Sequence, residues 1–147
     1  MRSIGRCAAI ACLILAGTGA SVAADVRFEA VEIYVDSGSA PLAAWQVELT
    51  EANGRMKVAG IENGEDAAFA EPPHYDRDAV EAGEADRVMV AAYSLSLESA
   101  LPRGRTRVTT VHVQIAGAGE PHFQVRLVAA GDAQGHPIAA QASLLER

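Results

Sequence analysis

Two histidines and two glutamines are the residues whose spacing most clearly suggests chemistry. His112 and Gln114 alternate along one strand-like run, and His122 and Gln124 alternate along the next. If a hairpin turn centres near Ala118, residue 114 pairs with 122 and residue 112 with 124, which places the four polar side chains on one face. The two imidazoles then become diagonal neighbours, about 7–8 Å apart between backbones. Such a pair could hold a divalent ion, but no third strong ligand is forced nearby, and a solvated polar face is the alternative.

The acidic segment 62–87 is the second candidate for chemistry. It contains nine carboxylates and two arginines, a net charge of −7. Oxygen ligands of this kind bind calcium, but the segment lacks the Asp-x-Asp-x-Asp-Gly spacing of a specific calcium loop. Calcium binding and a solvated acidic loop both stay open. Phe69 and Tyr75 are expected to pin the segment to the body of the protein, and a short helical turn is predicted over 76–82.

Motifs for catalysis are not found in the sequence. The chain has no Gly-x-Ser-x-Gly elbow, phosphate-binding glycine loop, dinucleotide fingerprint or His-Glu-x-x-His pair. Both cysteines, Cys7 and Cys12, lie within the first 24 residues, so the rest of the chain has no thiol, disulfide or thiolate metal site. The sequence therefore predicts a protein that is not an enzyme and needs no cofactor.

Aromatic side chains bear on carbohydrate binding, because flat sugar-binding faces use exposed rings. Three rings are predicted to face the interior: Trp45, Phe28 and Phe123. Three tyrosines are the outward candidates: Tyr34, Tyr75 and Tyr93. No predicted strand presents a row of rings. A polysaccharide ligand therefore depends on Tyr34 or Tyr93 alone.

Most of the remaining chain alternates apolar and polar residues with period two, the pattern of half-buried strands. Strands are predicted over residues 27–36, 44–49, 56–61, 87–96, 106–115, 122–130 and 137–145. Phe28 and Ala30 fall on the opposite parity from Val31, which predicts a bulge near Ala30. The run 87–96 is apolar on both faces, as in a central, covered strand.

Asn53-Gly54 lies between two of these strands and predicts a tight hairpin, because both residues tolerate positive φ. With no long helix and turn signals at the spacing of a sandwich, the sequence predicts an all-β fold. We expect an antiparallel β-sandwich of seven to eight strands, and a closed barrel is the alternative. Trp45 is expected to anchor its core, because it shares the parity of Val47 and Leu49.

The first twenty-four residues have the features of an export signal. Arg2 and Arg6 precede an apolar run, and Val22-Ala23-Ala24 is a suitable cleavage site. The apolar run is too short to cross a bilayer, because a membrane-spanning helix needs about 20 residues. We therefore expect a signal peptide over 1–24, one domain over 25–147, and a secreted or periplasmic protein with no integral membrane span. The mature chain would carry ten basic and nineteen acidic side chains, which disfavours nucleic acid and anionic membranes as partners.

Two short stretches carry a family resemblance: Leu42-Ala43-Ala44-Trp45-Gln46-Val47-Glu48-Leu49-Thr50 and Val58-Ala59-Gly60-Ile61-Glu62-Asn63-Gly64. The first is similar to the second strand of cohesin-type domains, and the second matches their Val-x-x-Ile-Glu-x-Gly pattern. Three later stretches fit the remaining strands: 87–96, 106–115 and Val125–Ile138. The likeness covers most of 26–145 and extends to several carbohydrate-binding modules and to small exported bacterial proteins without an assigned activity. It implies a jelly-roll sandwich, and no partner-binding residue can be transferred from it.

These observations predict an exported, non-catalytic binding or adhesion domain with a cohesin-like fold that mediates protein–protein contact. Its working surface is expected to be the 62–87 segment or an open sheet face. The tight connection from Thr50 to Met56 departs from the cohesin pattern, and recruitment of dockerin-bearing enzymes is not expected. A carbohydrate-binding module is the first alternative, and a metal-dependent periplasmic protein is the second.

Overall fold

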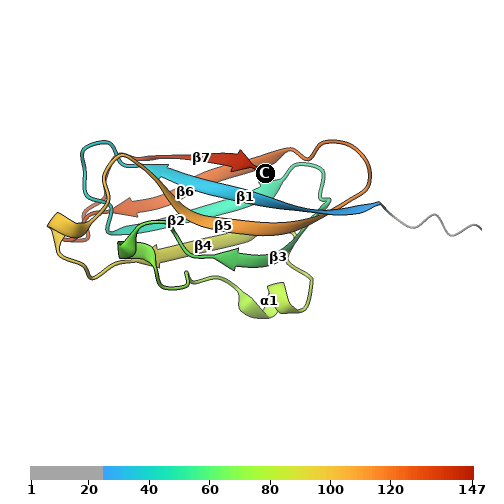
Figure 1. Cartoon of the computed structure of the whole chain (residues 1–147), viewed down its shortest axis with the longest axis horizontal. Coiled ribbons are helices and arrows are strands. Elements are labelled where there is room, and N and C mark those ends of the chain that lie inside the picture. The colour runs from blue at the N-terminus through green and yellow to red at the C-terminus, as the bar shows by residue number, and fades with distance from the viewer. Residues whose placement is uncertain (1–24) are drawn as a thin grey trace, which may run out of the picture.

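The computed structural model describes residues 25–147, and the predicted signal peptide lies outside the described residues (Figure 1). Strands make up most of the fold: β1 (Val26–Asp36), β2 (Ala44–Glu51), β3 (Met56–Glu62), β4 (Val88–Tyr93), β5 (Arg105–Ala116), β6 (Phe123–Gly131) and β7 (Gln141–Glu146). Helical turns are short: η1 (Ala67–Phe69), α1 (Arg77–Glu81) and η2 (Glu98–Ala100). Within 25–147, every helix is too short or too polar to cross a bilayer.

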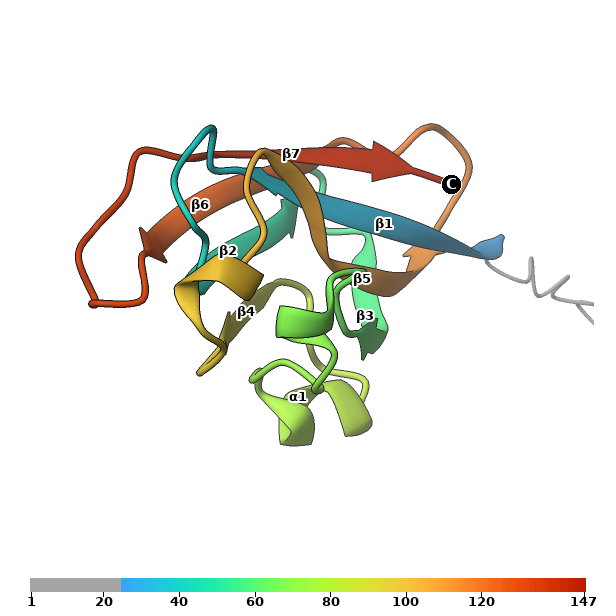
Figure 2. The same cartoon turned by 60° about the vertical axis from the view of Figure 1, so that its left-hand side comes forward.

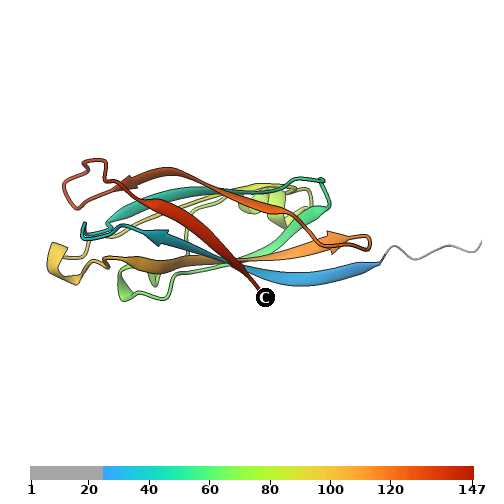
Figure 3. The same ribbon diagram turned by 90° about the horizontal axis from the view of Figure 1, so that it is seen from above.

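The strands form two antiparallel sheets that pack face to face (Figure 2). One sheet has the order β3-β5-β1-β7 and the other has the order β4-β2-β6. Figure 3, seen from above, shows the two layers. The predicted fold class, an antiparallel β-sandwich of seven to eight strands, is confirmed with seven strands in the described range.

The core lies between the sheets and is built from the inward side chains of both. Fully buried members include Ile33, Leu49, Met56 and Ile115. Trp45 is 2% exposed, and its ring meets that of Phe69 edge to face, with centroids 6.1 Å apart. The predicted roles of Trp45 as a core anchor and of Phe69 as the pin of the acidic segment are both confirmed.

The predicted hairpin at Asn53-Gly54 is wrong. β2 belongs to the three-stranded sheet and β3 to the four-stranded sheet, so the turn carries the chain across the sandwich. Gly54 has φ +66° and its N–H donates to the carbonyl of Glu51 at 3.2 Å, whereas Asn53 keeps a negative φ. A turn of this kind needs glycine only at its last position, unlike the hairpin turn that the sequence pattern favours.

The predicted pairing of β5 with β6 across Ala118 is wrong for the same reason. β5 lies between β3 and β1, whereas β6 is an edge strand of the other sheet. Both crossings lie at the end of the sandwich where β1 begins (Figure 1). The Ala52 N–H donates to the His122 carbonyl at 3.0 Å, and the Ala116 N–H donates to the Arg55 carbonyl at 3.1 Å. Alternation along two strands does not determine whether they pair or face each other.

Two further predictions about β1 are wrong. β1 pairs with β5 without interruption from Val26 to Ile33, and the register shifts between Ile33 and Tyr34 instead of near Ala30. Phe28 is 69% exposed, because its parity places it on the outer face of the sheet. A change of parity in the sequence reflects an exposed aromatic here, not a bulge. Phe123, on β6, is half-buried against the core.

β4 is an edge strand, so the prediction of a central, covered strand over 87–96 is wrong. Val88 and Val90 are buried, but Met89 and Tyr93 are 43% and 63% exposed. The free edge is covered at one point, where His74 and Ala91 exchange two backbone hydrogen bonds of 2.7 and 3.0 Å. The acidic segment therefore contacts β4 on the side where a further strand of the sheet would lie.

The short helix predicted over 76–82 is confirmed as α1. The Asp76 carboxylate caps its first turn by accepting the Ala79 N–H at 3.0 Å. Tyr75 is half-buried against the core beside it, as predicted.

Candidate functional site

Three large apolar side chains project into solvent at the end of β4 and just beyond it. Tyr93, Leu95 and Leu97 are 63%, 91% and 80% exposed, and they alternate with Ser94 and Ser96. We call this stretch the 93–97 row. A fully buried leucine is worth about 1.5–3 kcal/mol relative to an exposed one, so neither leucine contributes appreciably to folding. Exposed apolar clusters of this kind mark interaction sites.

The backbone of the 93–97 row is held in place while its side chains stay free. The Ser94 N–H donates to the Ala43 carbonyl at 2.7 Å. The Ser94 hydroxyl accepts the Ser96 N–H at 3.2 Å, and the two hydroxyls lie 3.0 Å apart. The Leu97 carbonyl accepts the Ala100 N–H at 2.8 Å, which starts η2. The row is therefore displayed on a tethered backbone, which lowers the entropy cost of binding.

A stacked pair of rings divides the surface beside the row into two grooves. The rings of His74 and Tyr93 lie 6.0 Å apart between centroids and are parallel to within 3°. Both residues line a groove of about 690 Å³ across the outer face of the three-stranded sheet. They also line a second groove, of about 700 Å³, between the acidic segment and the row.

The floor of the first groove is made of small side chains on adjacent strands. Ala91 on β4 and Ala129 on β6 both lie opposite Gln46 on β2. Beyond β6 the wall is a loop shaped by Asp132, whose carboxylate accepts the backbone N–H groups of Gln134 at 2.9 Å and His136 at 2.8 Å. The His136 N–H makes the largest contribution to lowering the pKa of Asp132, so the carboxylate stays charged. The groove thus has small side chains on its floor and one wall that is held by hydrogen bonds to Asp132.

The second groove lies between η1 and the 93–97 row. Its lining includes Phe69, Glu71 and Pro72 on one side and Ala92 and Leu95 on the other. The η1 side is fixed by local bonds: the Asp66 carboxylate accepts the Ala68 N–H at 2.8 Å, and the Asn63 amide donates to the Ala70 carbonyl at 2.8 Å. Both walls are therefore anchored before any partner arrives.

The acidic segment beside this groove carries charge that the protein does not neutralise. Glu62 bonds to His112. The other eight carboxylates of the segment have no ion-pair partner within residues 25–147: Glu65, Asp66, Glu71, Asp76, Asp78, Glu81, Glu84 and Asp86. Most of these side chains are exposed. Glu71 and Arg77 both line the second groove, and the other unpaired carboxylates lie on the segment outside it.

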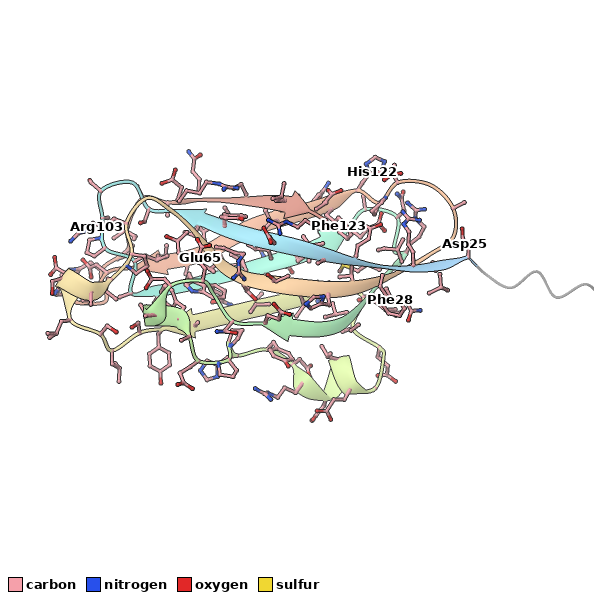
Figure 4. The ribbon with its side chains drawn as sticks, in the orientation of Figure 1. Asp25, Phe28, Glu65, Arg103, His122 and Phe123 are labelled. Carbon is pink, nitrogen blue, oxygen red and sulfur yellow. The ribbon has the colours of Figure 1, made fainter. Side chains whose placement is uncertain are left out.

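The predicted pair of histidines does not form. His112 lies on the four-stranded sheet, with its Nε2 2.8 Å from Glu62 Oε1. His122 lies in the crossing between β5 and β6, at the same end as Asp25 (Figure 4). The glutamines separate with them, since Gln114 is on β5 and Gln124 on β6. Within residues 25–147, no three His, Cys, Asp or Glu side chains gather in a metal-binding arrangement.

The tyrosines proposed as outward contacts have three different environments. The Tyr34 ring lies under the Arg105 guanidinium at 3.6 Å, and its hydroxyl donates to Glu32 at 2.7 Å, which raises the pKa of Tyr34. Tyr75 is half-buried. Tyr93 alone of the three is largely exposed, and it belongs to the other sheet from Tyr34. The structure therefore separates the two tyrosines on which a sugar-binding face would depend.

The sequence pattern does not predict the exposure of Leu95 and Leu97. Their period-two alternation continues that of β4, so the pattern predicts a buried strand to Ser96, whereas β4 ends at Tyr93. The signal available is the alternation of Ser94 and Ser96 with Tyr93, Leu95 and Leu97, which leaves one face apolar and the other polar.

Comparison with known proteins supports the fold and identifies no homologue in sequence. No family model matches the chain, and no curated protein matches it. Its structure is similar to a chain of the CaDoc0917–CaCohA2 complex solved at pH 5.5, with a TM-score of 0.55 and 11% identity over 78% of this chain and 82% of that chain. It also resembles a chain of the Coh-OlpA–Doc918 complex, a type I cohesin–dockerin complex from Clostridium thermocellum, with a TM-score of 0.48 and 11% identity over 74% of this chain and 91% of that chain. The fold is a cohesin-like β-sandwich, as the resemblance in the sequence implied.

Proposed function

We propose that this protein is an exported, non-catalytic binding domain that contacts another protein through the 93–97 row and the two grooves beside it. The observation that carries the proposal is the exposure of Tyr93, Leu95 and Leu97 on one tethered stretch. Large apolar and aromatic side chains of this kind supply most of the energy at protein interfaces. Their exposure gains nothing for the isolated fold.

A protein partner suits this surface better than a small molecule. The first groove runs over Gln46 with an alanine on either side, and the row projects outward instead of enclosing a cavity. Small-molecule sites are usually concave and bury most of their ligand. The similar chain of the CaDoc0917–CaCohA2 complex belongs to a two-protein assembly, which also favours a protein as the ligand.

The proposal includes export. Residues 1–24 have the charge, apolar run and small-residue site of a signal peptide, and we propose that cleavage leaves 25–147 as a single domain in a secreted or periplasmic location. The first strand starts at Val26, one residue after the proposed new terminus, so removal of the leader leaves every strand intact.

Capture with matched variants tests the proposed surface. The exported protein, a Leu95→Ser/Leu97→Ser double variant and a Leu145→Ser control are immobilised and exposed to extract of the cells that make it. Leu145 is 43% exposed on β7 of the other sheet, so the control removes an exposed leucine outside the proposed surface. We expect the wild type and the control to retain the same partner protein. The amount retained by the double variant should be lower by about tenfold or more.

The double variant is expected to melt at the same temperature as the wild type, because both leucines are exposed. Equal retention by all three proteins would contradict the proposed surface. Recovery of a polysaccharide in place of a protein would favour the carbohydrate-binding alternative.

A further inference from the structure

We infer that the segment of the partner that contacts the 93–97 row is extended and basic, with lysine or arginine alternating with apolar side chains. This inference rests on the proposed function and specifies the chemistry of its ligand. Three features carry it: the distribution of charge, the position of the acidic segment, and the free edge of β4.

The negative charge of the protein is concentrated on one side because cations elsewhere are already paired. Arg126 lies 2.7 Å from Glu48, Arg27 lies 2.7 Å from Glu29, and Arg147 lies 3.3 Å from Glu32. None of these three cations reaches the 62–87 segment, whereas Lys57 and Arg107 donate to its backbone carbonyls at Glu84 and Asn63, at 3.3 and 3.2 Å. Its own Arg77 lies over the ring of Tyr75 at 5.2 Å and is not ion-paired with any residue from 25 to 147. The segment therefore keeps a field that attracts positive charge.

The acidic segment lies directly beside the apolar row. The double hydrogen bond between His74 and Ala91 places it against the free edge of β4. Glu71 lines the same groove as Leu95. In Figure 2 the whole segment, from η1 to α1, lies on the side of the sandwich formed by β3 and β4. A partner that covers the row is therefore brought within reach of Glu71 and against the acidic segment that carries it.

The free edge of β4 favours an extended backbone in the partner. Ala91 directs its N–H and C=O to His74, so by strand alternation Tyr93 directs its own groups to the same edge. The residue opposite Tyr93 in this register is Pro72, which has no N–H and ends the ladder. β4 ends at Tyr93, so this residue offers the last N–H and C=O of the edge to an added strand. Leu95 and Leu97 follow beyond the strand, where side chains of the same extended segment would meet them.

The apolar and charged contacts act on different parts of binding. Burial of the leucines would hold the complex together, whereas exposed charges mainly raise the rate of association and select the partner. Added salt separates the two kinds of contact, because it screens the charges and leaves the apolar burial in place. Raising the salt concentration from about 0.1 M to about 1 M shortens the Debye length from about 10 Å to about 3 Å. Salt should weaken binding without abolishing it.

Synthetic peptides test the inference directly. Three labelled peptides are titrated with the exported protein and followed by fluorescence anisotropy: alternating Lys and Leu, alternating Glu and Leu, and alternating Lys and Ser. We expect the Lys–Leu peptide to bind at least about tenfold more tightly than either of the others. Substitution of Leu95 and Leu97 by serine should weaken its binding by a similar factor.

A charge variant completes the test. Glu71→Gln, Asp78→Asn and Glu81→Gln remove three charges from the segment, and the control removes three from elsewhere: Asp36→Asn, Glu120→Gln and Glu146→Gln. We expect the first set to weaken Lys–Leu binding by about tenfold and the control by no more than about twofold. Equal effects of the two sets, or equal binding of the Glu–Leu peptide, would overturn the inference.

The peptide and capture experiments distinguish failure of this inference from failure of the proposed function. If the leucine variant loses its captured protein but the peptides show no preference for lysine, the surface stands and the basic partner is wrong. If the leucine variant loses nothing in the capture assay, the proposed function itself is wrong.

Discussion

Replacement of Glu51 by glutamine is expected to destabilise the protein strongly, because this carboxylate joins the two crossings between the sheets. Its side chain is fully buried. Oε2 accepts the backbone N–H groups of Asn53 at 3.0 Å and Arg55 at 2.9 Å, and Oε1 accepts the His122 N–H at 3.1 Å and the Asn53 amide at 3.2 Å. A glutamine would turn an NH2 group toward one of these pairs of donors.

The magnitude follows from the bonds lost. A hydrogen bond to a charged group contributes about 1.5–3 kcal/mol, so two unmatched donors cost about 3–5 kcal/mol after some local adjustment. A domain of this size loses on the order of 10 °C or more in melting temperature for such a change. Thermal and urea unfolding, followed by circular dichroism, measure it. Glu146→Gln is the control, because Glu146 is exposed and lacks an ion-pair partner within 25–147.

The pH dependence gives a second readout. Burial alone would raise the pKa of Glu51, but the N–H donors from Arg55, His122 and Asn53 outweigh it and hold the pKa below the ordinary value of 4.5. Since the pKa is lower in the folded chain, this contribution is present above pH 4.5 and is lost as the pH falls through the folded value. The stability difference between wild type and Glu51→Gln should therefore be constant from neutral pH to about pH 5 and shrink below it. A difference under about 1 kcal/mol at neutral pH, or one that persists unchanged in acid, would refute the role given to Glu51.

Three other predictions concern the core, the acidic segment and the leader. Trp45→Ala should cost about 3–5 kcal/mol by urea unfolding, and a cost below about 1 kcal/mol would contradict its place in the core. Gly64→Ala should cost about 1–3 kcal/mol, because a Cβ there would meet two backbone carbonyl oxygens at 3.0 Å. Gly60→Ala, whose Cβ would meet nothing within 4 Å, should stay within about 0.5 kcal/mol, and equal costs would contradict the packing described. Intact-mass measurement of the exported protein should give a chain that begins at Asp25, whereas a chain that begins at Met1 would exclude cleavage.

Local patterns in the sequence predict the strands well, because each strand buries one face and the alternation follows from that. The positions of β2, β5 and β6, the burial of Trp45 and the capped turn at Asp76 all follow from neighbouring residues. The resemblance to cohesin-type domains also anticipates the fold that the CaDoc0917–CaCohA2 complex supports.

The pairing of strands does not follow from alternation. Both short connections, at Asn53-Gly54 and at Ala118, look like hairpins, yet each crosses between sheets. Glu51 bonds to backbone groups on both connections and lies 71 residues from His122 in the chain. A contact at that distance is invisible to a local pattern.

The candidate site was harder to predict than the fold for a related reason. Leu95 and Leu97 are apolar like core residues, but they share the parity of Met89 and Tyr93, on the outer face, and lie beyond the end of β4. The charge of the acidic segment predicts a working surface there, but its position beside β4 depends on one bridge between His74 and Ala91. The metal-binding pair failed because it required the β5–β6 pairing that does not form.

The most direct measurement of the proposed surface is site-specific photo-crosslinking in the cells that make the protein. A photoreactive amino acid replaces Leu95 in one variant and Leu145, on the opposite sheet, in the other. We predict a covalent adduct with one protein at position 95, diminished by excess unlabelled wild type, and little or none at position 145. Equal labelling at both positions, or no protein adduct at position 95, would contradict the proposed protein-binding surface.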